Sequence, residues 1–227
     1  MAQLHVLRVF VNDEGEWGNP LGVFLDGTEV PEERRQGIAA ELGFSETVYV
    51  EDREGGRMRI FTPAVELPFA GHPSVGTAWL LREQGHDVPA LHPPAGELGV
   101  RVEGDATFVS ADPAWCPPFE YVQLPDPAAV RALDGPQYEG DVYAWAWIDE
   151  DAGTVRARSF AGAVGIPEDE ATGSAALALS TQVGRPIVVN QGRGSLLVAR
   201  PLEDGRGEVG GRVTLDETRE FELWGSG

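Results

Sequence analysis

Three residues of this 227-residue sequence stand where an acid or a base could act on a small molecule. Glu46 lies between a short loop and a run that favours a β-strand; the alternative interpretation is a solvated surface acid. His72 follows the expected start of a helix, where the dipole lowers the pKa of an imidazole and favours its neutral, proton-accepting form. It could instead merely contact the helix end. Asp169 lies between two glutamates before a second expected helix, and these carboxylates could simply stabilise that helix.

The segment from Arg57 to Leu81 positions His72. Its pattern predicts a strand, a turn-forming segment and a helix of small residues that begins near Gly71. A helix start of this kind presents unpaired backbone N–H groups and a positive dipole end, which suit an anion. The second half repeats this order, with a strand at 155–160 and a helix that begins near Gly173. The repetition favours a duplicated fold with a site between its halves.

Hydrophobic periodicity and turn residues predict the remaining elements. A helix opens at Pro31 and is stopped by Gly43. The prolines of Asp112–Pro118 make this segment the best candidate for a linker. We expect the two central helices at 72–84 and 174–182, and strands at 4–11, 21–25, 47–50, 57–61, 97–103, 106–110, 142–148, 155–160, 186–190, 195–199, 207–215 and 220–224.

The charge and hydropathy of the chain limit its partners and its location. The formal net charge of −20 argues against nucleic acid or an anionic membrane as a partner. No run approaches 18 apolar residues, and the N-terminal sequence lacks the layout of a signal peptide. We therefore expect a cytoplasmic protein without a membrane partner.

Two features of the composition exclude several chemistries. All 17 basic residues are arginine, so a lysine Schiff base is excluded. The single cysteine, Cys116, permits neither an internal disulfide nor a mechanism with two thiols, and its setting predicts a packed small side chain. The sequence also contains no standard nucleotide-binding loop.

Four separated motifs give the chain a resemblance to the phenazine-biosynthesis PhzF-like family, whose fold is that of diaminopimelate epimerase. The resemblance covers nearly the whole chain. The motifs, in chain order, are Gly18-Asn19-Pro20-Leu21, Phe44-Ser45-Glu46-Thr47, the long segment from Phe61 to Pro73, and the segment from Gly165 to Ser174.

The resemblance implies a role for each candidate residue. Glu46 would be the acid/base that takes and returns a substrate proton, with His72 and Asp169 on either side of the substrate. The groups that would bind the substrate and its carboxylate are Gly71, Gly173, Ser174 and Asn19. No cofactor or metal is implied, and a homodimer is the family's usual assembly. Related amino-acid epimerases use two cysteines, which this chain lacks.

Two departures from the family pattern bear on the site. Glu170 stands where the family commonly has proline, which adds a charge beside the proposed site. The region from Thr181 to Ser195 looks compressed, and its Gln-Gly-Arg-Gly-Ser end keeps only part of a glycine-arginine-serine segment.

We therefore expect an α+β fold of two similar domains, 1–112 and 118–227, each a curved, mostly antiparallel sheet around a central helix. The active cleft would lie between them, and the last strand would return to the first domain. The leading hypothesis is a cofactor-independent isomerase or epimerase of a small carboxylate. The alternatives are a non-catalytic small-molecule-binding protein that keeps the cleft, favoured by the two departures, and a purely structural dimer.

Overall fold

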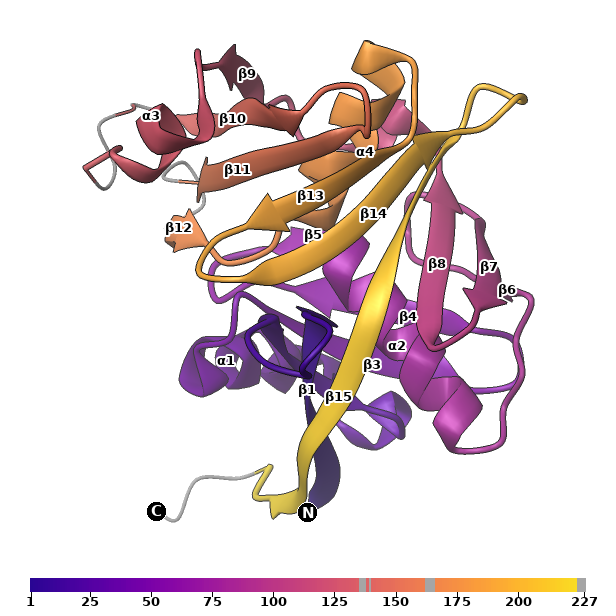
Figure 1. Ribbon diagram of the computed structural model, residues 1–227. Coiled ribbons are helices and arrows are strands. Elements are labelled where there is room, and N and C mark those ends of the chain that lie inside the picture. Colours follow the sequence, from indigo (N-terminus) through magenta and orange to yellow (C-terminus); the bar gives the residue numbers. More distant parts are fainter. Residues whose placement is uncertain (135–137, 139, 162–165, 224–227) are drawn as a thin grey trace.

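The structure is a computed structural model that describes residues 1–134, 138, 140–161 and 166–223. Its elements form two lobes, with strands curved around one buried helix in each (Figure 1). This arrangement confirms the predicted α+β class.

The first lobe surrounds helix α2 (Gly71–Glu83). A second helix, α1 (Glu32–Leu42), lies outside the sheet and ends, as predicted, at Gly43, whose φ of 68° is the left-handed conformation of a helix C-cap. The strands of this part are β1 (Ala2–Val11), β2 (Asn19–Phe24), β3 (Glu46–Asp52), β4 (Arg57–Phe61), β5 (Glu66–Leu67), β6 (Ala90–Leu91), β7 (Leu98–Glu103) and β8 (Ala106–Ala111).

The second lobe surrounds helix α4 (Gly173–Val183). A short helix, α3 (Pro127–Arg131), precedes the main strands of this lobe. The strands are β9 (Glu120–Gln123), β10 (Asp141–Asp149), β11 (Thr154–Ala161), β12 (Ile166–Asp169), β13 (Ile187–Gln191), β14 (Ser195–Pro201) and β15 (Gly207–Phe221).

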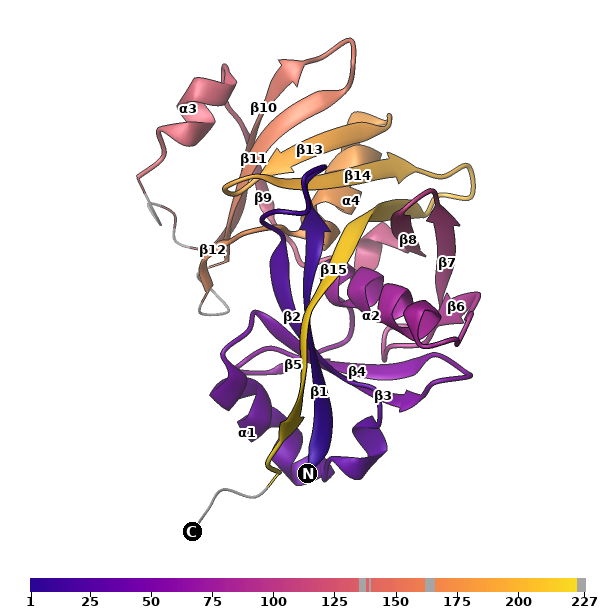
Figure 2. The same cartoon turned by 60° about the horizontal axis from the view of Figure 1, so that its bottom comes forward.

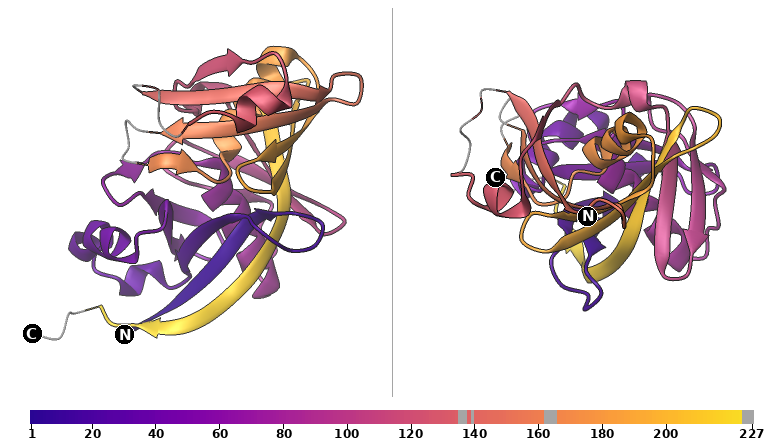
Figure 3. Two further views of the ribbon diagram at one scale, coloured as in Figure 1. Left: turned by 60° about the vertical axis from the view of Figure 1, so that its left-hand side comes forward. Right: turned by 45° about the horizontal axis from the view of Figure 1, so that its top comes forward.

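Strand β15 joins the two lobes into one continuous sheet. Its first residues pair with β14 and β8, and its later residues pair with β1, all antiparallel. The principal strand order is β5-β4-β3-β2-β1-β15-β14-β13-β11-β10-β9. Figures 2 and 3 show β15 running beside β1 and into the second lobe. The final strand thus returns to the first half, while the domain bounds of 1–112 and 118–227 stay a prediction.

Both central helices are enclosed because their small residues let strands approach closely. In α2, the eight residues from Gly71 to Ala78 are all buried. A Cβ atom on Gly76 would lie 2.6 Å from the Leu21 side chain, so this position admits only glycine at the observed spacing. Each helix starts one residue before its predicted first residue, and each ends within one residue of its predicted end.

The structure corrects the prediction of two separate C-terminal strands. Residues 207–221 form one strand of 15 residues, although its segment 215–220 is exposed throughout and lacks alternation. Pairing with β1, for example Thr218 with His5, continues the strand there. Trp224 lies outside the described residues. The short elements β5, β6, β9, α3 and β12 were not predicted from the sequence.

The predicted linker is partly ordered structure. Pro113–Trp115 forms a 3₁₀ turn that Asp112 caps by accepting a hydrogen bond from the Ala114 N–H. The Trp115 ring packs edge-on against Phe69, with the ring centroids 6.4 Å apart. No described helix is long and apolar enough to cross a membrane.

Candidate functional site

A cavity of about 70 Å³ lies where the two lobes meet, which is enough for a few waters or a small molecule. One wall is apolar and consists of Leu67, Phe69, Ala70, Pro117, Phe119 and Ala161. The polar lining consists of Glu46, Thr62, Asp141, Asp169, Thr172 and Ser174. Residues from both halves of the chain thus contribute to one enclosed space.

Glu46 is the first residue of β3, and its side chain is 12% exposed. Its Oε2 is buried without a hydrogen-bond partner among the described residues. Burial, with a contribution from the charge of Asp169, raises the pKa of Glu46 to about 8. Burial beside Phe44 was predicted to raise the pKa of Glu46. In the structure Phe44 packs against the separate cluster around Ile38.

His72 is the second residue of α2 and is 3% exposed. Its Nε2 lies 3.4 Å from Oε2 of Glu46 and has no hydrogen-bond partner among the described residues. Burial lowers the pKa of His72 to about 3, partly offset by a hydrogen bond to the backbone of Pro20. Because Nε2 is unpartnered, Nδ1 carries the hydrogen that the Pro20 carbonyl accepts. The lone pair of Nε2 therefore faces Glu46.

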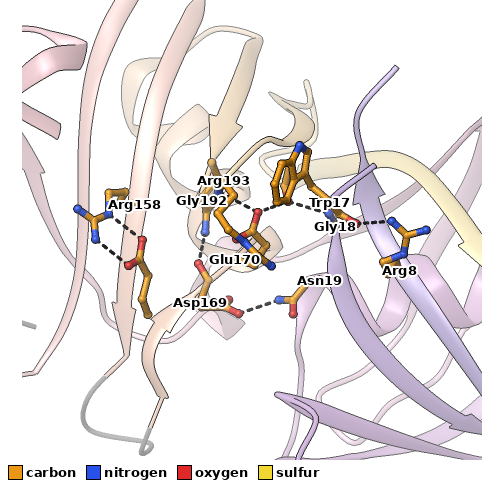
Figure 4. Close-up of polar contacts among 12 residues, drawn as sticks. Arg8, Trp17, Gly18, Asn19, Arg158, Asp169, Glu170, Gly192 and Arg193 are labelled. Atoms are coloured by element: carbon orange, nitrogen blue, oxygen red, sulfur yellow. Dashed lines mark hydrogen bonds and ion pairs between the residues drawn. The ribbon is translucent and has the colours of Figure 1, made fainter. Parts of the chain in front are cut away.

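Asp169 ends β12 and contacts the first lobe through Asn19 (Figure 4). The Asn19 Nδ2 group donates to Asp169 Oδ1 over 2.7 Å and to the Ala171 carbonyl over 2.9 Å. The Thr172 hydroxyl donates to Asp169 Oδ2 over 2.6 Å. Burial raises the pKa of Asp169 to about 6, although these donors from Thr172 and Asn19 oppose the rise.

These pKa values assign a charge state to each group at neutral pH. Glu46 is mostly protonated, His72 is neutral and Asp169 is mostly ionised. The contact between Glu46 and His72 is therefore not an ion pair near pH 7. The arrangement holds one exchangeable proton and one negative charge beside the cavity, which are the elements of general acid–base chemistry.

The two central helices begin against each other at this cavity. A Cβ on Gly71 would lie 2.7 Å from the carbonyl carbon of Gly173, and a Cβ on Gly173 would lie 3.0 Å from the His72 N. Neither helix has a side-chain cap, because Ala70 has no polar atom and the Thr172 hydroxyl is turned to Asp169. The positive ends of both dipoles therefore meet without capping side chains.

The structure brings all seven predicted site residues to one region. Glu46, Asp169 and Ser174 line the cavity, and His72 points at Glu46. The predicted contact of Asn19 with substrate stays a prediction. In the structure its amide spans Asp169, Ala171 and Ser45, and Ser45 Oγ donates to its Oδ1 over 3.0 Å.

Glu170, the departure expected to charge the site, does not line this cavity, but its charge contributes to raising the pKa of Asp169. Its Oε1 accepts hydrogen bonds from the Arg193 N–H over 2.9 Å and from Ser195 Oγ over 3.0 Å. Ser195 Oγ in turn accepts from the Gly18 N–H, and the Arg193 guanidinium lies 5.0 Å from the Trp17 ring centroid (Figure 4). Glu170 thus holds the hairpin of the compressed region, and Ser195 of that hairpin contacts the first lobe through Gly18.

Three polar residues that support Asp169, namely Tyr143, Thr172 and Gln191, were not predicted as site residues. Tyr143 OH donates to Gln191 Oε1 over 2.9 Å, and Gln191 Nε2 donates to Thr172 Oγ1 over 2.9 Å. Thr172 and Gln191 lie within quoted motifs, so their position next to glycines was the available signal. Tyr143 lies inside an ordinary strand pattern and gave no signal.

Among the described residues, no group of three or more His, Cys, Asp and Glu side chains is arranged to hold a metal ion. The single thiol, Cys116, is half-buried, and burial raises its pKa to about 12. It contacts the hydrophobic core, as predicted.

Comparison with known proteins decides the family. The chain is 33% identical to the trans-2,3-dihydro-3-hydroxyanthranilate isomerase of Pseudomonas fluorescens, over 87% of this chain and 89% of that protein. It belongs to the PhzF-like family. The sequence model of this family, the phenazine biosynthesis-like proteins, matches residues 8–118. The predicted resemblance and the predicted isomerase class are thereby confirmed.

Solved structures of the PhzF-like family share the fold. A PhzF-family protein of Bacillus anthracis superposes with a TM-score of 0.79 at 20% identity, over 97% of this chain and 99% of that one. A Pseudomonas aeruginosa protein described as a predicted epimerase superposes with a TM-score of 0.74 at 25% identity, over 97% and 99% of the two chains. The agreement over nearly the full length supports the epimerase-like fold.

Proposed function

We propose that this PhzF-like protein moves a proton on a small carboxylate-bearing metabolite without a cofactor, with Glu46 as the acid/base. The observation that carries the proposal is the buried, unpartnered Oε2 of Glu46, which lines the cavity and lies 3.4 Å from His72 Nε2. A buried carboxyl without a partner is costly to a fold, so such a group is commonly kept for function.

The raised pKa of Glu46 suits proton transfer in both directions. A general acid–base works best when its pKa lies near the working pH, because both of its protonation states are then accessible. At a pKa of about 8, Glu46 is mostly protonated at pH 7 and retains a minor ionised fraction. Isomerisation would begin when this ionised form takes a proton from the substrate carbon, and it would end when Glu46 returns the proton to another position.

The paired helix starts supply the proposed carboxylate site. Gly71 and Gly173 pack directly together, so an anion would lie beside them on the cavity side, near Ser174. Two uncapped positive helix ends in contact stabilise a negative charge there. These helix ends would supply the positive charge that the absent lysines cannot. The negative net charge of the chain acts only weakly on the bound carboxylate, because salt screens charges more than about 8 Å apart.

His72 and Asp169 would flank the substrate. The neutral His72 would hold the substrate against Glu46, since its unprotonated Nε2 can accept a hydrogen bond from a substrate N–H or O–H group and faces the same carboxyl. The ionised Asp169 would attract positive charge on the substrate and keep the Glu46 proton in place, because its charge raises the pKa of Glu46.

The experiment is solvent deuterium uptake, followed by NMR. A panel of small carboxylates, including the trans-2,3-dihydro-3-hydroxyanthranilate named for the Pseudomonas fluorescens relative, is incubated with the protein in deuterated buffer. We expect uptake into at least one compound and a loss of at least about 100-fold in Glu46→Gln. The exposed Glu41→Gln on α1 is the matched control and should retain full activity.

Two results would reject the proposal. If Glu46→Gln exchanges deuterium as fast as the wild type, Glu46 is not the proton carrier. If a carboxylate binds with saturation but takes up no deuterium, the binding-protein alternative is favoured. That alternative was motivated in part by Glu170, which does not line the cavity.

A further inference from the structure

A chain of buried polar groups supports Asp169 on the side away from Asn19. It runs from Tyr143 OH to Gln191 Oε1, from Gln191 Nε2 to Thr172 Oγ1, and from the Thr172 hydroxyl to Asp169 Oδ2, over 2.9, 2.9 and 2.6 Å. Gln191 Nε2 also donates to the Asp169 carbonyl over 3.0 Å. Tyr143 and Gln191 are fully buried, and Thr172 is 8% exposed.

The partners determine the direction of every hydrogen bond in this chain. The Asp169 carbonyl can only accept, so the Gln191 amide nitrogen must face it. The Gln191 oxygen therefore faces Tyr143, whose hydroxyl must donate. The second amide hydrogen goes to Thr172 Oγ1, which leaves the single Thr172 proton for the Asp169 carboxylate.

We propose that Gln191 is a positioning residue for Asp169. Gln191 directs the Thr172 hydroxyl proton onto the Asp169 carboxylate and thereby holds this carboxylate ionised at the cavity wall. The relevance of this role to catalysis rests on the proposed function, in which Asp169 lies beside the substrate. The contacts themselves do not depend on that function.

The N-cap position of Thr172 makes this use of its hydroxyl unusual. Threonine before the first residue of a helix usually accepts a hydrogen bond from a backbone N–H of the first turn. Thr172 makes no such bond to α4 and donates to Asp169 instead. Gln191 thus has two effects: it supplies a donor to Asp169, and it leaves the α4 helix start open towards the cavity.

The charges around Asp169 make this support necessary. The titratable groups near it are Glu46 from β3, Tyr143 and Asp141 from β10, and Glu168 and Glu170 on its own segment. His72 from α2 contacts the Asn19 amide, which also bonds to Asp169. Arg158 from β11 is paired with Glu168. No described arginine bonds directly to the Asp169 carboxylate, so neutral donors must stabilise its charge.

The test is a carbon-13 NMR titration of the Asp169 side-chain carboxyl, assigned by its loss in Asp169→Asn. Gln191→Leu should raise the pH of half-titration by about one unit, because a hydrogen bond to a charged acceptor changes ionisation about tenfold. Thr172→Val, which removes the donor itself, should raise it at least as much. Gln182→Leu, exposed on α4, is the matched control and should leave it unchanged.

Tyr143→Phe keeps the proposal testable if Gln191→Leu does not fold. This variant retains the ring and removes only the donor to Gln191 Oε1, so a smaller rise in the same direction is expected. An unchanged titration in the folded Gln191 variant, or in Tyr143→Phe where it alone folds, overturns the proposal. Because the titration needs no substrate, it remains decisive even if no compound exchanges deuterium. If deuterium exchange depends on Glu46 but the pH of half-titration of Asp169 is unchanged in these variants, only the role of Gln191 is rejected.

Discussion

The carboxyl Oε2 of Glu46 and the imidazole Nε2 of His72 lie 3.4 Å apart, and neither has a hydrogen-bond partner among the described residues. The two atoms come from different elements, the start of β3 and the first turn of α2. Burial moves both pKa values towards the neutral forms, so the pair holds one proton between two acceptors rather than two charges. This is a state suited to proton transfer.

The raised pKa of Glu46 predicts an effect on stability. Between the usual pKa of 4.5 and about 8, the folded protein binds a proton that the unfolded chain releases, so this group reduces stability as pH rises through that range. Glu46→Gln should therefore be more stable than the wild type by a few kcal/mol at pH 8, and nearly equal to it at pH 4.5. Urea denaturation at several pH values measures the difference. Glu41→Gln should show no such trend, and a pH-independent difference for Glu46→Gln would contradict the burial argument.

The contact between the two helix starts predicts a large effect of one methyl group. A Cβ on Gly71 would meet backbone atoms of Gly173 and Ser174 at 2.7 Å, and backbone cannot move aside cheaply. Gly71→Ala should cost about 2 kcal/mol of stability and most of the activity. Gly37→Ala on α1, where a Cβ would have open space, should instead stabilise by about 0.5 kcal/mol. Equal effects of the two substitutions would show that the helix starts are not in close contact.

Glu170 is expected to stabilise the hairpin through which Ser195 contacts Gly18 of the first lobe. Glu170→Ala leaves the Arg193 N–H and the Ser195 hydroxyl without their acceptor, at a cost of about 1–2 kcal/mol. Glu170→Gln keeps an amide oxygen and should cost less. Glu168→Ala, which removes a more exposed ion pair with Arg158 on the same segment, is the matched control and should cost under about 1 kcal/mol. Chemical denaturation ranks the three variants by their free energy of unfolding. A Glu168→Ala variant that is less stable than Glu170→Ala would argue against this role of Glu170.

Much of the site could be anticipated from the sequence because its backbone has a local signature. A strand, a loop and a glycine that opens a small-residue helix occur twice, and this repetition suggested a site between the halves, where the two helix starts meet beside the cavity. The role of Glu46 came from the resemblance, since its local pattern also fits a surface acid. The apolar residues that line the cavity with Glu46, such as Leu67, Phe69 and Phe119, are distant from it in sequence.

The remaining features depend on contacts that no local pattern encodes. Tyr143 occupies an ordinary strand position, and only the placement of Gln191 at the end of β13 joins it to Thr172 and Asp169. The single strand β15 was predicted as two because residues 215–220 are exposed, and its continuity comes from pairing with β1. The hydrogen bonds of Glu170 likewise require the hairpin of Arg193 and Ser195 beside it.

Cys116 should be irrelevant to catalysis. Burial raises the pKa of its thiol to about 12, so almost no reactive thiolate is present at neutral pH. Iodoacetamide at pH 7.5 should leave the thiol and the activity intact, and Cys116→Ala should remain active. Rapid alkylation with loss of activity would contradict the packed environment of this side chain.

The pH dependence of deuterium exchange tests the central role of Glu46 most directly. The measurement is kcat/KM for exchange from pH 5.5 to 9.5, for the wild type and Glu46→Gln. The wild-type value should rise about tenfold per pH unit from pH 6.5 and level off near pH 8, where the ionised form of Glu46 becomes dominant. Glu46→Gln should lose this rise together with the activity. A profile that is flat between pH 6 and 9, or a rise that persists in Glu46→Gln, would contradict the account.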